Sequence, residues 1–174
     1  MKKYIVLLRG INVSGKNKLP MAELRELLNN LGFKNVQTYI QSGNIILESD
    51  DGKSVLCNKI KESIQTKFGY DVPVIARTIS EWKKVIVNYP FSTDNPKIVA
   101  FVFLNRKVYE TKIEVKGVNN DEYLIDNDMV YIHCPTGFAK TKLSNNLFER
   151  KLNVTATTRN YNTTLKLLEL AENK

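Results

Sequence analysis

The chain has 174 residues, and 43% of them are hydrophobic, which is enough to bury an ordinary core. No apolar run approaches the roughly 18 to 20 residues of a membrane-spanning helix, and the N-terminus enters a short apolar run without a small-residue cleavage site, so we expect a cytoplasmic protein with no membrane partner. The net charge of +8 favours anionic partners, but it is spread along the chain and does not identify nucleic acid by itself.

The first half of the chain shows the order strand, helix, strand, strand, helix, strand. The predicted strands cover residues 4–8, 36–40, 44–48 and 72–79, and the predicted helices cover residues 21–31 and 51–69. A short helix carrying Trp82 follows, with Ser80 as its expected N-cap. This βαββαβ order is the ferredoxin-like, or split βαβ, arrangement.

The same order returns after residues 88–96. We predict strands at residues 98–104, 122–126, 129–134 and 154–158, and helices at residues 106–116, 140–151 and 161–172. The fold class is therefore α+β, with two ferredoxin-like (βαββαβ) halves that arise by duplication. Their expected boundaries are residues 1–88 and 97–174, each with a trailing helix. Because both faces of the first sheet are apolar, the second half is expected to cover one of them, giving one compact body.

The segment from Arg9 to Lys18 is a basic, glycine-containing loop without an acidic residue. In a split βαβ fold this loop lies beside the turn from Gln41 to Asn44. The candidate ligand-binding residues at this edge are Arg9, Gly10, Asn12, Lys16, Lys18, Gln41, Ser42 and Asn44. Arg9 can bind a phosphate or carboxylate with two hydrogen bonds, and the amides and hydroxyl can bind a base, a sugar or an amide. In the alternative interpretation, Arg9 and Asn12 only brace the loop against the turn.

The same topology places residues 135–140 beside residues 157–163 in the second half. Both segments lead into helix N-termini, where free backbone N–H groups favour anions. The candidate ligand-binding residues here are Lys140, Arg159 and Asn160. The structural alternative is that Asn160 acts as an N-cap and Tyr161 as a packing residue.

Several familiar motifs are not supported. Gly10 and Gly15-Lys16 have the spacing of a phosphate-binding P-loop, but Asn17 replaces the Ser or Thr that would bind Mg²⁺, and the next helix begins only near Pro20. His133 is the only histidine, and no pattern around it supplies a triad or a metal site. We therefore assign no catalytic residue, metal or cofactor. Cys57 and Cys134 are far apart and are interpreted as buried reduced thiols.

Four segments resemble one bacterial family. They are Arg9–Val13, Met21–Leu28, Thr38–Asn44 and Ala156–Thr163. In this order they resemble the uncharacterised bacterial proteins grouped as domain of unknown function 1697, and the resemblance extends over nearly the whole chain. It implies a duplicated ferredoxin-like fold and a small cytosolic protein, and it brings no accepted activity.

Three functional hypotheses follow from these patterns. The leading one is a binding module for a phosphorylated ligand, either nucleic acid or a nucleotide, that uses the Arg9–Lys18 loop. The second is an enzyme that acts on a small anionic substrate in a cleft between the halves, with Arg9 and Arg159 as anchors. The third is a module that binds a protein partner.

Overall fold

A computed structural model of the chain describes residues 1–173, and the chain divides into two compact units. Unit 1 comprises Met1–Lys83 together with the chain from Leu167 onward, and unit 2 comprises Lys84–Lys166. The boundaries fall inside helices α3 (Ile79–Val87) and α5 (Tyr161–Glu172). The predicted α+β class and the presence of two similar halves are confirmed.

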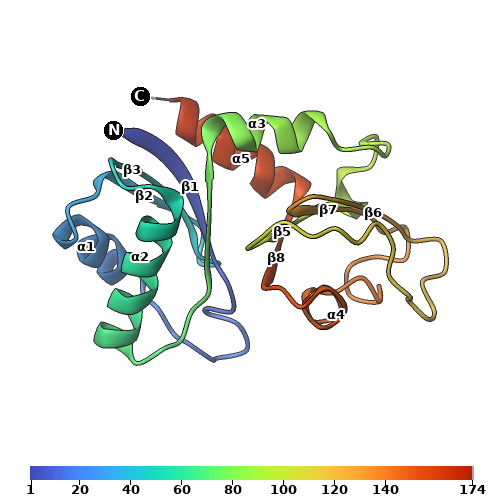
Figure 1. Cartoon of the computed structure of the whole chain (residues 1–174), viewed down its shortest axis with the longest axis horizontal. Coiled ribbons are helices and arrows are strands. Elements are labelled where there is room, and N and C mark those ends of the chain that lie inside the picture. Colours follow the sequence, from blue (N-terminus) through green and yellow to red (C-terminus); the bar gives the residue numbers. More distant parts are fainter. Residues whose placement is uncertain (174) are drawn as a thin grey trace. The chain divides into compact units, whose positions relative to one another are not determined.

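Unit 1 contains an antiparallel four-stranded sheet with the order β2-β3-β1-β4. Its strands are β1 (Lys2–Leu8), β2 (Lys34–Tyr39), β3 (Asn44–Ser49) and β4 (Val74–Thr78). Helices α1 (Met21–Asn30) and α2 (Lys53–Phe68) lie on one face of this sheet (Figure 1). The core on that face includes Tyr4, Val6 and Leu8 of β1. Ile5 and Leu7, whose side chains lie on the other face, are also buried.

Unit 2 repeats the sheet with the order β6-β7-β5-β8. Its strands are β5 (Val99–Leu104), β6 (Glu122–Asp126), β7 (Met129–His133) and β8 (Ala156–Asn160). A 3₁₀ turn, η1 (Pro96–Ile98), precedes β5, and helix α4 (Asn145–Leu152) covers one face. The core under α4 includes Ala100 and Val102 of β5 together with Phe148 of α4. Both sheets therefore have the strand order of a ferredoxin-like fold.

The two sheets can be compared residue by residue through their strand pairing. Tyr4 of β1 is opposite Leu47 of β3 and Thr78 of β4. Ala100 of β5 is opposite Ile132 of β7 and Asn160 of β8. Tyr4 and Ala100 therefore occupy the same position in the two halves. The same register makes Arg77 equivalent to Arg159 and Thr78 equivalent to Asn160.

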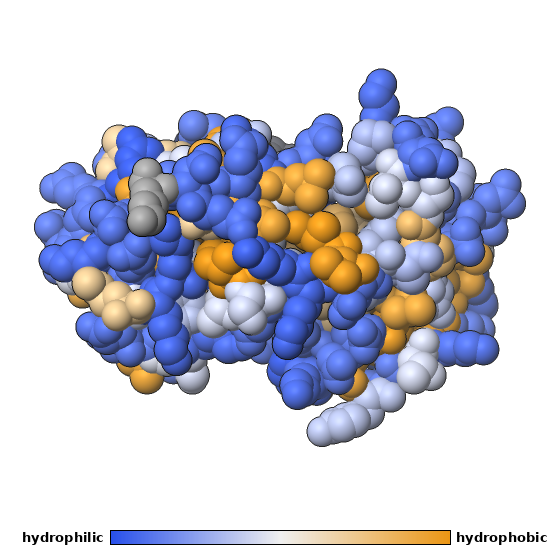
Figure 2. Space-filling view, turned by 90° about the horizontal axis from the view of Figure 1, so that it is seen from above, coloured by the Kyte–Doolittle hydropathy of each residue, from blue (hydrophilic) through white to orange (hydrophobic). Residues whose placement is uncertain are grey.

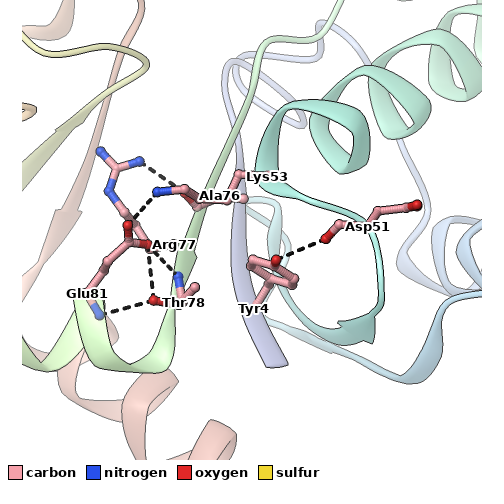
Figure 3. Close-up of polar contacts among 7 residues, drawn as sticks. All are labelled: Tyr4, Asp51, Lys53, Ala76, Arg77, Thr78 and Glu81. Atoms are coloured by element: carbon pink, nitrogen blue, oxygen red, sulfur yellow. Dashed lines mark hydrogen bonds and ion pairs between the residues drawn. The ribbon is translucent and has the colours of Figure 1, made fainter. Parts of the chain in front are cut away.

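The equivalent arginines share their burial and one backbone contact. Both are almost fully buried, at 6% exposure for Arg77 and 8% for Arg159. The Arg77 Nη1 donates to the carbonyl of Ala76 at 3.0 Å (Figure 3). The Arg159 Nη1 likewise donates to the carbonyl of Thr158 at 2.9 Å. This agreement in type, burial and backbone contact supports the duplication beyond the order of the elements.

The residues after these arginines cap the following helices. The Thr78 Oγ1 accepts a hydrogen bond from the backbone N–H of Glu81 at 3.2 Å, and the Asn160 Oδ1 accepts one from that of Thr163 at 2.8 Å. The prediction that Ser80 caps the first of these helices is wrong, because α3 already begins at Ile79.

The predicted helix at residues 106–116 is also wrong, since this segment forms loops. Its apolar residues do not follow a helical period but pack singly onto the core, Val108 buried and Ile113 partly buried. The Tyr123 hydroxyl holds the loop by donating to the Ile113 carbonyl at 2.8 Å, and the Val108 N–H donates to the carbonyl of Asn127 at 2.9 Å. The predicted helix at 140–151 starts later, because Ser144 is its N-cap.

Candidate functional site

The Arg9–Lys18 segment is a small hairpin with a defined backbone. The Lys16 N–H donates to the Val13 carbonyl at 2.9 Å. Ser14 and Gly15 between them have φ values of +50° and +72°, as in a type I′ turn. The Asn12 N–H also donates to the carbonyl of Asn17, at 3.2 Å. The tip of the loop is therefore held in one conformation by its own backbone.

Side-chain amides fix the base of this hairpin. The Asn12 Nδ2 donates to the carbonyls of Leu19 at 3.1 Å and Gln41 at 2.7 Å, while its Oδ1 accepts from the Leu19 N–H at 2.8 Å. The Asn17 Nδ2 donates to the Gly10 carbonyl at 3.0 Å. The structure thus brings the loop and the Gln41–Asn44 turn together, as the topology predicted, and Asn12 makes the connection.

The turn itself is packed closely against β1. The Leu8 N–H donates to the Gly43 carbonyl at 2.8 Å, and a Cβ atom on Gly43 would lie 2.6 Å from that of Leu8. Because Gly43 also has a φ of +82°, only glycine fits here without strain. Asn44 is buried and donates to the Tyr39 carbonyl at 3.2 Å and the Ser42 hydroxyl at 2.9 Å. Asn44 and Ser42 thus shape the turn.

The positive charge of this edge lies at exposed positions. Lys16 and Lys18 are exposed, and neither forms an ion pair within residues 1–173. Arg9 is half-buried, and its backbone N–H donates to the Pro73 carbonyl at 3.0 Å. Figure 2 shows a different face, the one seen from above, which is mainly hydrophilic with apolar patches; the loop after β1 lies on the far side of that view (Figure 1). This edge therefore offers two exposed ammonium groups on a backbone that is held in one conformation.

The predicted residues of the second half have different surroundings. Lys140 is exposed, whereas Arg159 is buried and also donates from Nη1 to the Thr157 hydroxyl at 2.8 Å. Asn160 is exposed and uses its Oδ1 as the cap of α5, as the structural alternative expected.

The segments expected to meet in unit 2 do meet, around a cavity of about 310 Å³. Phe138 comes from the first segment, and Thr158 and Asn160 come from the second. The full set of lining residues is Ala100, Ile132, Phe138, Thr141, Leu143, Ser144, Asn145, Thr158 and Asn160. The floor is apolar and the walls carry hydroxyls and amides, without a charged side chain.

A basic groove of about 440 Å³ in unit 2 was not predicted from the sequence. Its cations are Lys116, Lys142, Arg150 and Lys151, against the single acid Glu114. None of the four cations is ion-paired within the described part of the chain. Lys116 lies in a loop, Lys142 lies shortly before α4, and Arg150 and Lys151 lie in the last turn of α4. Only the adjacent pair 150–151 could therefore be noticed in the sequence.

Nothing in the sequence singles out Arg77 either, because one arginine in an apolar strand forms no pattern. Its equivalence to Arg159 appears only from the strand register.

His133 is half-buried, its Nδ1 lies 3.8 Å from the Glu122 carboxylate, and its ring is 5.8 Å from that of Phe91. No group of residues suited to a metal ion was found in residues 1–173.

The two cysteines differ in their burial. Cys134 is buried, and this burial raises the pKa of its thiol to about 11, so the thiol stays protonated at neutral pH. Cys57 is only half-buried, which corrects the prediction of full burial, although burial still raises its pKa.

Comparison with known proteins identifies the family. The family model described as "Protein of unknown function (DUF1697)" matches residues 1–131, a range that includes the loop and the turn of unit 1 but ends before Ala156–Thr163. A solved structure of the conserved bacterial protein SP0830 from Streptococcus pneumoniae is similar at 26% identity and a TM-score of 0.73, over 98% of this chain and 99% of that one. No curated protein matches the chain. Within residues 1–173, no helix has the length and apolar character needed to cross a bilayer. The chain belongs to the DUF1697 family of proteins of unknown function.

Proposed function

We propose that this protein is a binding module for phosphorylated ligands, with nucleic acid as the ligand class. The observation that carries the proposal is the pair Lys16 and Lys18, which are exposed and have no ion-pair partner among residues 1–173, on an acid-free hairpin of fixed backbone shape. Phosphate oxygens are the groups that unpaired lysines on a rigid loop bind well, because the loop loses little conformational entropy on binding.

Nucleic acid is favoured over a free nucleotide because both lysines are exposed, Lys16 beside the tip of the hairpin and Lys18 just after its base. A small metabolite is usually enclosed, whereas a polymer of phosphates binds to an exposed row of cations. The basic groove of unit 2 supplies four further cations of the same kind. Each unit can therefore contribute phosphate contacts of its own.

A protein partner is the second candidate. Val13, with 59% exposure, and Ile40, with 49%, place apolar side chains on the same hairpin and next to the same turn. Exposed apolar residues surrounded by polar ones are typical of protein contacts. The hypothesis of an enzyme with a cleft between the halves stays a prediction.

Fluorescence anisotropy with labelled single-stranded RNA, single-stranded DNA and duplex DNA of mixed sequence tests the proposal. The double variant Lys16→Gln/Lys18→Gln should bind more weakly and reduce the slope of log K against log salt by about 2, one for each lost phosphate contact. The matched control is Lys34→Gln/Lys67→Gln, which removes two exposed charges from β2 and α2 of the same unit and should leave the slope unchanged.

Two outcomes would contradict the proposal. The first is absence of binding to all three probes at low salt. The second is an equal loss for the loop variant and the control, which would mean that overall charge and not the hairpin holds the ligand.

A further inference from the structure

We propose that the 310 Å³ cavity of unit 2 is a binding site for a nucleobase, the flat, uncharged ring of a nucleoside or of an unpaired nucleotide. This inference depends on the cavity alone and goes beyond the proposed function, which assigned only phosphate contacts. Four observations support it: the comparison of the two halves, the loop that walls the cavity, its chemistry and its size.

The first half shows what normally occupies this position in the fold. Tyr4 lies where unit 2 has Ala100, and its ring is buried under α2 with the hydroxyl donating to the Asp51 carbonyl at 2.9 Å (Figure 3). Replacing such a ring by a methyl group leaves a ring-sized space, and Ala100 lines the cavity. A planar ring is thus the group that the architecture accommodates at this position.

The roof of the space also differs between the halves. Helix α2 has 16 residues and α4 has only 8, and the loop of residues 135–144 precedes α4. This loop contributes Phe138, Thr141 and Leu143 to the cavity wall. The small side chain of Ala100 on β5 and the short helix α4 therefore both leave space in the same region, and this space forms the cavity.

A buried carboxylate holds the loop in place. Asp121 accepts a hydrogen bond from the Thr136 N–H at 3.0 Å. Burial alone would raise the pKa of this carboxyl, but hydrogen bonds from Thr141 and Thr136 outweigh that effect and lower the pKa. The wall is thus fixed before any ligand binds, which reduces the entropic cost of binding.

The lining matches the two surfaces of a base. The apolar residues Ala100, Ile132 and Leu143, with Phe138 at 39% exposure, can cover its faces, and an exposed phenylalanine is a common stacking partner. Hydroxyls and amides can bind its edge, since Ser, Thr and Asn supply both donors and acceptors. The polar residues are Thr141, Ser144, Asn145, Thr158 and Asn160. Thr158 and Asn145 already hydrogen-bond each other at 2.6 Å, which orients both.

Size and polarity favour a base over a tyrosine side chain from a partner protein. The volume lies at the lower end of the roughly 300–1,000 Å³ of ligand sites, which suits a single ring system. A phenol has one polar group, and Tyr4 satisfies its own with a single carbonyl. Each of the five polar side chains around the cavity already has one hydrogen-bond partner, but their hydroxyls and amides keep further donors and acceptors, which are more than a phenol with one hydroxyl can use.

The test uses the full chain and the four free ribonucleosides, adenosine, guanosine, cytidine and uridine. Ligand-observed NMR detects binding, and calorimetry gives the dissociation constant. The variant Ala100→Tyr restores the residue of unit 1 and fills the cavity, so it should weaken nucleoside binding by about 10-fold or more. Phe138→Ala removes the stacking partner without touching the core and should weaken it by about 5- to 100-fold. The control Leu124→Ala removes another partly exposed apolar side chain of unit 2 and should change nothing.

The inference is overturned if no nucleoside binds at millimolar concentration, or if Ala100→Tyr with a native amide NMR spectrum binds as the wild type does. It is also overturned if p-cresol, the analogue of a tyrosine side chain, binds more tightly than every nucleoside. Should Ala100→Tyr fail to fold, Phe138→Ala decides alone. Nucleosides carry no phosphate, so this result is independent of Lys16 and Lys18 and of the proposed function.

Discussion

The two halves of the chain share a sheet but differ in what fills the space beside the position that Tyr4 occupies in β1 and Ala100 in β5. In unit 1, Tyr4 fills that space, and α2 covers it with 16 residues. In unit 2, Ala100 leaves a cavity, and a loop with the 8-residue α4 forms the wall. The features that both halves keep are the strand register, a buried arginine and a helix cap. A duplicated fold can thus keep the same framework in both halves, while one half fills a space with a core side chain and the other half leaves that space open.

Removing the Tyr4 ring should cause the largest loss of stability among the tests of this comparison. Tyr4→Ala creates in unit 1 the void that unit 2 already has, but under a full-length helix that cannot form a polar wall. We expect a loss of about 3–5 kcal/mol in the free energy of unfolding, measured by urea denaturation. The control Tyr4→Phe keeps the ring, loses only the bond to Asp51, and should cost about 1 kcal/mol. A cost for Tyr4→Ala no greater than that of the control would show that the ring is not a core element.

Asp121 provides a smaller test, aimed at the loop that replaces the first part of the helix. Its pKa is lowered in the folded protein, so the carboxylate stabilises the fold above the unfolded pKa of about 4, and that stability is lost as pH falls through the lower folded value. Asp121→Asn should cost about 1–3 kcal/mol at pH 7 and lose this part of the acid dependence. Urea midpoints between pH 7 and pH 3 give both quantities.

Hydrogen exchange locates the same effect, because the amides of residues 135–143 should lose protection in Asp121→Asn. The exposed Asp94 serves as the control, and Asp94→Asn should change neither the midpoints nor the exchange. If the stability of Asp121→Asn depended on pH as that of the wild type does, contacts other than Asp121 would hold the loop in place.

The shared caps should give the smallest effect, and an equal one in both halves. Thr78→Ala and Asn160→Ala each remove the hydrogen bond to a first-turn N–H, so each should cost about 1 kcal/mol in thermal or urea unfolding. Thr78→Ala also removes the bond from its hydroxyl to the partly exposed Glu81 carboxylate at 3.1 Å, which should add little. Values that differ several-fold would mean that the caps are not equivalent despite their common register.

Much of the fold could be predicted from the sequence, because alternating apolar residues and the turns at Gly43 and Asn127 mark both hairpins. The proximity of the Arg9–Lys18 loop to its turn followed from topology alone. The helix at residues 106–116 could not be excluded, since Val108 and Ile113 are compatible with several patterns until their packing is known.

The candidate sites were predicted less completely, for a physical reason. A loop motif is contiguous and can be recognised, but a cavity depends on a residue that is missing. Ala100 looks like an ordinary strand residue. The cavity beside it can be expected only once the register shows that Ala100 occupies the position that Tyr4 has in unit 1. The basic groove likewise joins Lys116, Lys142 and Arg150, which are distant in sequence.

The division of the chain also sets the order in which its units can be completed during synthesis. Unit 2 is one continuous segment, whereas unit 1 uses both ends of the described chain, and the Lys3 Nζ donates to the Ala171 carbonyl at 2.9 Å. At ordinary translation rates, roughly 4 to 17 s separate the emergence of Lys83 from that of Leu167. The first sheet is therefore made early but must wait for its C-terminal segment, while unit 2 can be completed before it.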